Sequence, residues 1–192
     1  VFGKDGRDKL ISGIDKIANA VGSTLGARGR TVLIESEHHV GGITVTKDGV
    51  TVAKAINLMD PAENLAVMVM REASEKTANA AGDGTTTSMV LAQSLIHMAM
   101  REMEPTDNVT QVLRDIQSAS TNVIEELTLK SVEVTPDRLI DVATISANGD
   151  AVIGEIIADA YNQVGLNGVV TVEASANSET YSEVVSGMKI DR

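Results

Sequence analysis

Apolar residues recur every three or four positions through most of the chain, which is the spacing of amphipathic helices. The first such stripe consists of Leu10, Ile14, Ile17, Val21 and Leu25. A second helix is expected from Asp60-Pro61 to about Ala81, because Asp is a favoured N-cap and Pro fits the first helical position. The pattern predicts further helices over residues 85–98, 106–127, 136–143 and 153–164.

Extended segments are fewer. Residues 31–35 and 43–46 read as two strands, and the polar, glycine-ending stretch 36–42 between them favours a hairpin. Residues 169–173 read as a later strand, and 184–192 as the start of another. The character of the chain changes near Leu129. The expected fold class is therefore mainly α with a small α+β appendage.

The composition of the chain excludes or disfavours several classes of function. The chain has 192 residues and a net charge of −11, and only 2% of its residues are aromatic, which disfavours nucleic-acid binding. The core must be aliphatic. No cysteine is present, so disulfides and thiolate metal sites are excluded. No apolar run is long enough to span a membrane, and a cytoplasmic location is the default expectation.

Three polar, glycine-bearing turns interrupt these elements: Thr24–Gly29, Lys47–Gly49 and Gly82–Thr87. Glycine allows a ligand to approach the backbone, and the amides that open a helix at Thr85 are a natural phosphate seat. Asp83 is a candidate Mg²⁺ ligand. Asp48 is a candidate for orienting or deprotonating an attacking water. The pattern is not a P-loop, because no Lys follows the second glycine.

Each turn alone has a simpler interpretation. Gly-Asp-Gly between helices is often a tight turn, and Lys-Asp-Gly is often a plain hairpin turn. Only the three together favour a phosphate site, and one sequence does not reveal whether they meet in space.

The motifs resemble those of the group I (GroEL-type) chaperonins over nearly the whole chain. The matching segments are Thr24-Leu25-Gly26 with Gly29-Arg30, Thr46–Val50, Gly82–Thr87, Val90–Gln93, Ile145–Asn148, Gly168-Val169 with Thr171–Glu173, and the closing Val184-Val185, Gly187-Met188 and Asp191-Arg192. The resemblance implies an ATP-binding equatorial domain over residues 1–128, the first segment of an intermediate domain over 129–185, and the start of an apical domain over 186–192.

The same resemblance implies the site. The nucleotide-binding positions would be Thr24, Leu25, Gly26, Ala27, Lys47, Asp83, Gly84, Thr85, Thr86, Thr87, Ile145 and Ser146. Asp83 would hold Mg²⁺, the backbone carbonyls of Thr24 and Lys47 would line a K⁺ site, and Asp48 would help to position the hydrolytic water. The expected protein is an ATP-driven folding chaperone. It would form a homo-oligomer of one or two seven-membered rings. It would act on non-native client proteins and work with a co-chaperonin lid.

Some positions depart from the family pattern. Ala27 stands where the family usually has Pro, the stretch 35–42 is about two residues longer, and Met103-Glu104-Pro105 lacks the usual Asn. These departures fit a divergent member, from a bacteriophage or an unusual bacterium. The chain is expected to lack the apical domain and the returning halves of the other two domains. A rival interpretation is therefore a non-catalytic module that caps or regulates a full-length subunit.

Overall fold

The computed structural model describes residues 3–26, 28–35, 42–165, 168–175, 178–185 and 187. The chain divides into two compact units, Val1–Asn108 and Val109–Arg192, which are described separately.

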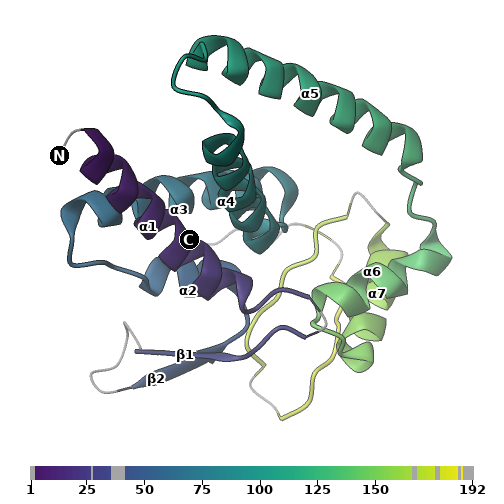
Figure 1. Ribbon diagram of the computed structural model, residues 1–192. Helices are drawn as coiled ribbons and strands as arrows, with labels where there is room; N and C mark the ends of the chain where they lie inside the picture. The colour runs from purple at the N-terminus through teal and green to yellow at the C-terminus, as the bar shows by residue number, and fades with distance from the viewer. Residues whose placement is uncertain are drawn as a thin grey trace. The chain divides into compact units, whose positions relative to one another are not determined.

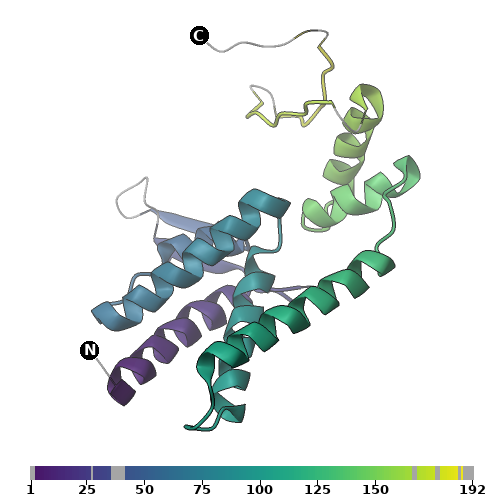
Figure 2. The same ribbon diagram turned by 90° about the horizontal axis from the view of Figure 1, so that it is seen from above.

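The first unit is a helical group with one hairpin. Its helices are α1 (Gly3–Gly22), α2 (Gly49–Ala55), α3 (Pro61–Ala81) and α4 (Thr85–Glu102). The long helices α1 and α3 lie side by side, and α4 packs against both (Figures 1 and 2). The helix patterns predicted from the sequence are confirmed here, and the segment from Gly49 to Ala55 is a helix as well.

The core of this unit is aliphatic, as the scarcity of aromatic residues requires. Its centre is formed by Ile17 and Val21 of α1, Val52 of α2, Val67 of α3 and Met89 of α4, each almost completely buried. Because these residues come from four helices, the end of α1, the whole of α2 and the first turns of α4 are fixed relative to one another.

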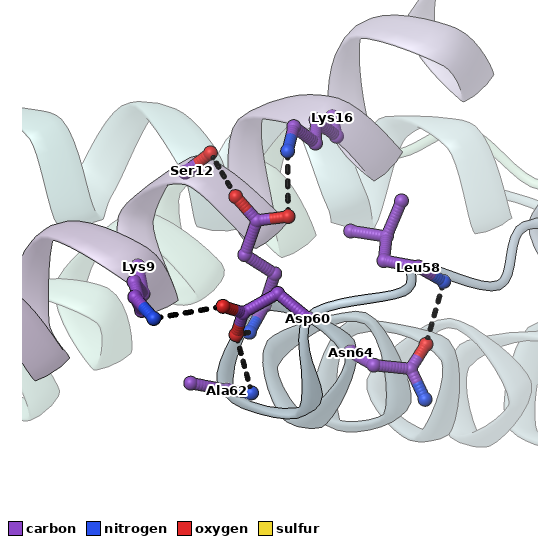
Figure 3. A network of polar contacts seen from close by, with 8 residues as sticks. Lys9, Ser12, Lys16, Leu58, Asp60, Ala62 and Asn64 are labelled. Atoms are coloured by element: carbon purple, nitrogen blue, oxygen red, sulfur yellow. Dashed lines mark hydrogen bonds and ion pairs between the residues drawn. The ribbon is translucent and has the colours of Figure 1, made fainter. Parts of the chain in front are cut away.

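A polar network joins α1 to the start of α3 (Figure 3). Lys9 Nζ lies 2.8 Å from Asp60 Oδ2, and Lys16 Nζ lies 2.6 Å from Glu63 Oε2. Ser12 donates to the other oxygen of Glu63 at 2.8 Å. Asp60 also caps α3 by accepting from the amides of residues 62 and 63, as its position before Pro61 predicts.

The predicted hairpin is confirmed as strands β1 (Val32–Glu35) and β2 (Ile43–Thr46). They pair antiparallel, with Val32 opposite Thr46 and Glu35 opposite Ile43. The expected extra length between them falls on residues 36–41, which lie outside the described part of the chain, as does Ala27.

The second unit contains α5 (Val109–Lys130), the short 3₁₀ helix η1 (Pro136–Arg138), α6 (Leu139–Ser146) and α7 (Ala151–Val164). Helices α6 and α7 pack closely, since a Cβ at Gly154 would fall 2.2 Å from Thr144 Oγ1. Helix α5 buries none of its residues.

The strand predicted over residues 169–173 is wrong, because these residues form no strand. Most of the strand predicted over 184–192 lies outside the described residues, and residues 184 and 185 form none. Val169 and Val172 are almost fully exposed, and among the described residues the only sheet is the two-stranded one of β1 and β2. A segment with strand composition needs a hydrogen-bonding partner, and this one has none there.

The predicted fold class is confirmed, a mainly helical structure with a two-stranded antiparallel hairpin. The predicted domain limits at residues 128 and 185 remain predictions. Among the described residues, no helix is both long and apolar enough to cross a membrane.

Candidate functional site

The turn after α1 is compact and folds back on itself. Thr24 is buried, and its hydroxyl donates to the carbonyl of Val21 at 2.7 Å. Gly26 has a φ of 72°, in the left-handed region that favours glycine. Gly29 donates to the carbonyl of Gly26 at 2.9 Å, which closes the loop, while Leu25 remains partly exposed.

Asp48 is the N-cap of α2. Its carboxylate accepts from the amide of Val50 at 3.4 Å, and from the amide and hydroxyl of Thr51 at 2.9 and 2.5 Å. Partial burial raises the pKa of Asp48, but the hydrogen bonds from Thr51 and Val50 outweigh it and hold the pKa below its ordinary value. Asp48 is therefore ionised at neutral pH, which suits it to accept a hydrogen bond more than to remove a proton.

The turn between α3 and α4 places Asp83 between two left-handed glycines, Gly82 with a φ of 75° and Gly84 with a φ of 86°. The Asp83 side chain is exposed, and its carboxylate accepts from the amide of Gly84 at 2.6 Å. Helix α4 begins without a side-chain cap, whereas α2, α3 and α7 each begin with a capping aspartate. The first amides of α4 are therefore available to an anion.

Gly49, at the end of the Lys47–Gly49 turn, lies against two neighbouring helices. A Cβ at this position would fall 2.1 Å from Thr86 Oγ1 and 3.2 Å from Val21 Cγ1. Gly49 is thus in direct contact with the first turn of α4 and with the last turn of α1, three residues before Thr24. The close approach needs glycine, because any other residue would place an atom inside Thr86.

Two residues of α3 hold the neighbouring segments, and no motif selects them from the sequence. Arg71 donates to the carbonyls of Ala53 and Ile56 at 3.2 and 2.7 Å. The buried hydroxyl of Ser74 donates to the carbonyl of Thr85 at 3.4 Å. The only sequence signal is that Arg71 and Ser74 are three residues apart and so share one face of a helix.

The remaining predicted residues are less constrained. Lys47 and Thr87 are exposed, and Lys47 directly precedes the cap of α2. Ile145 and Ser146 are exposed at the end of α6, in the second unit, whose placement relative to the three turns is not part of the description. Their contact with a nucleotide remains a prediction.

The donor set fits a magnesium–phosphate group. The exposed carboxylate of Asp83 lies two residues before the uncapped start of α4. It is the oxygen ligand that Mg²⁺ prefers, and the first amides of the helix are donors for phosphate oxygens. The predicted K⁺ ligands are the backbone carbonyl oxygens of Thr24 and Lys47. The carbonyl oxygen of Thr24 lies against Gly29, since a Cβ on Gly29 would fall 2.1 Å from this oxygen.

Residues 17–192 match the TCP-1/cpn60 chaperonin family. The chain is also similar to a solved structure of the chaperonin gp146 from bacteriophage EL, which was determined in the presence of ATP-BeFx. That similarity has 31% identity and a TM-score of 0.76, and it covers 88% of this chain and 30% of that one. A second crystal form of the same protein gives 33% identity and a TM-score of 0.73, over 86% of this chain and 29% of that one.

A group III chaperonin in the open state shares the fold, with a TM-score of 0.65 and 24% identity over 80% of this chain and 31% of that one. The chain thus spans about a third of the length of the solved chaperonins that it matches.

Proposed function

Because the chain belongs to the TCP-1/cpn60 chaperonin family, we propose that it is the nucleotide-binding part of a chaperonin subunit of the group I type. The whole protein would bind and hydrolyse ATP to drive the encapsulation and refolding of non-native proteins. The supporting relatives are chaperonins, and one of them was crystallised with ATP-BeFx.

The observation that carries the proposal is the contact of Gly49 with Thr86 and Val21. This contact brings the Lys47–Gly49 turn against Thr86 of the Gly82–Thr87 turn and against Val21, three residues before Thr24. A tight turn that served only to reverse the chain would have no need for so close a contact.

In the proposed mechanism each group has one task. The amides and hydroxyls of Thr85–Thr87 hold the phosphates, and Thr24, Leu25 and Gly26 contact the rest of the nucleotide. Asp48 uses its hydrogen bonds to Val50 and Thr51 to keep its carboxylate in place, with one oxygen lone pair left to orient the attacking water. Positioning of this kind accounts for much of the catalysis in phosphoryl transfer.

Asp83 would hold Mg²⁺, and the carbonyls of Thr24 and Lys47 would hold K⁺. When bound, the cations neutralise charge on the phosphates. The acidity of the chain, −11 overall, makes this local neutralisation important.

The proposed assembly is a homo-oligomeric ring of seven subunits, single or double, which acts on non-native clients and works with a co-chaperonin lid. The cytoplasm is the proposed compartment, because the reaction depends on a supply of ATP.

Asp83→Ala tests the magnesium site in the full-length protein. We expect loss of Mg-ATP binding by calorimetry, while Asp8→Ala, which changes another exposed aspartate in the same unit, should bind normally. Near-normal affinity in Asp83→Ala would contradict the proposal.

Asp48→Ala tests the water-positioning role. We expect the rate of ATP hydrolysis to fall more than the affinity for ATP, because Asp48 acts on the attacking water and not on the bound phosphates. Equal losses in both quantities would remove this role from Asp48.

A further inference from the structure

Arg71 holds the end of α2 that lies opposite Asp48. From its place on α3, the guanidinium donates through Nε to the carbonyl of Ala53 and through Nη2 to the carbonyl of Ile56. Ala53 is in the last turn of α2 and Ile56 is its C-cap. The last carbonyls of a helix lack partners within the helix, and a cation there also complements the helix dipole.

Helix α2 is short enough for its two ends to move together. It has seven residues, which corresponds to a length of about 10 Å. Buried Val52 and Ala53 hold its middle, Arg71 holds its C-terminal end, and Asp48 is the cap at its N-terminal end. A tilt at the Arg71 end therefore displaces the Asp48 carboxylate.

The same stretch of α3 also holds α4. Ser74 lies one helical turn after Arg71, is almost completely buried, and donates to the carbonyl of Thr85. Arg71 and Ser74 thus connect one face of α3 to both the helix that carries Asp48 and the first residue of the proposed phosphate seat.

We propose that Arg71 is a positioning residue for ATP hydrolysis, which keeps the Asp48 carboxylate at its working distance from the first turn of α4. The inference rests on the proposed function, since it assumes that Asp48 orients the attacking water. Arg71 acts through α2, and its two hydrogen bonds go to backbone carbonyls of that helix.

The test compares ATP hydrolysis by the assembled full-length protein with Arg71→Met and Arg71→Lys. Arg71→Met removes both hydrogen bonds and the charge, so we expect kcat to fall about tenfold while KM for ATP changes less than about twofold. Arg71→Lys keeps the charge and one donor group, and its kcat should lie between those of the wild type and Arg71→Met. Arg101→Met is the matched control, because Arg101 is exposed and its ion pair is with the adjacent Glu102, and it should leave both constants unchanged.

The same substitutions in an Asp48→Ala background separate positioning from general stability. If Arg71 acts through Asp48, Arg71→Met lowers kcat in the wild-type background and has no further effect once Asp48 is removed. An equal loss in both backgrounds would overturn the inference, as would an unchanged kcat in Arg71→Met.

If Arg71→Met does not assemble, Arg71→Lys decides the question, and a wild-type kcat for that variant would overturn the inference. A wild-type kcat for Asp48→Ala would instead refute the proposed function, and the inference with it. A low kcat for Asp48→Ala with a normal kcat for the Arg71 variants would refute the inference alone.

Discussion

Replacing Gly49 with alanine would test the close contact of this residue with Thr86 and Val21. Gly49 is the first residue of α2, so its backbone suits alanine. The added Cβ, however, would lie 2.1 Å from Thr86 Oγ1, well short of the 3.4 Å at which ordinary contact begins. It would also lie 3.2 Å from Val21 Cγ1, so the methyl group is confined on two sides.

The expected cost follows from two opposing effects. Overpacking of a tightly filled site costs about 1–3 kcal/mol, because side chains or helices must shift to accept the new atom. Alanine is favoured over glycine in a helix by up to about 1 kcal/mol, and less at the first position. We therefore expect Gly49→Ala to lower the free energy of unfolding of the first unit by about 1–2 kcal/mol.

A double-mutant cycle with Thr86→Ala isolates the clash. Thr86→Ala deletes Oγ1 and leaves only Cβ, which lies 3.4 Å from the new methyl group. Urea unfolding followed by far-ultraviolet circular dichroism gives the free energies of the four variants. We expect most of the cost of Gly49→Ala to disappear in the Thr86→Ala background. An equal cost in both backgrounds would refute the contact, and a stable Gly49→Ala single variant would refute the close approach itself.

Three further predictions concern the same unit. Gly13→Ala should destabilise it by about 2 kcal/mol in urea unfolding, because the new Cβ would lie 2.2 Å from the backbone carbonyl oxygen of Glu63, which no side-chain rotation relieves. Gly84→Ala should cost about 1–2 kcal/mol in the same assay, because alanine is strained at a φ of 86°. The hydrogen bond from Lys9 lowers the pKa of Asp60 below its ordinary value of 3.8. The stability that this interaction gives the folded state is therefore fully present above pH 3.8, and it is lost as the pH falls through the lowered pKa. A melting temperature measured from about pH 6 to pH 2 should therefore fall at the acid end. The fall should be smaller in Asp60→Asn, and an identical pH profile would contradict the assignment.

Local patterns in the sequence predict much of this fold. The stripe through Ile17 and Val21 and the Asp60-Pro61 start signal identify α1 and α3, because both depend on neighbouring residues alone. The strand prediction over residues 169–173 is wrong because a strand does not depend on neighbouring residues alone. The composition of these residues favours a strand, but a strand requires a partner, which local composition does not supply.

The residues of the candidate site also fall into those that local sequence patterns predict and those that depend on the tertiary fold. Glycine and aspartate in three turns identify Asp48, Asp83 and the threonines after Gly84 as residues of interest. Whether they share one site depends on how α1, α2 and α4 pack, and of these predicted residues the structure shows Thr86 against Gly49, the residue after Asp48. Arg71 is not predicted at all, since its partners are backbone carbonyls whose position depends on the tertiary fold.

Helix α4 has Gly84 as its N-cap and begins with no side-chain cap hydrogen bond to its first amides. Aspartate side chains cap α2, α3 and α7, whereas an anion at the start of α4 would have no side-chain cap to displace. If the proposed phosphate seat is correct, amide hydrogen exchange at Thr85–Thr87 should slow sharply when nucleotide binds, so the exchange rates of these three amides would report the bound fraction.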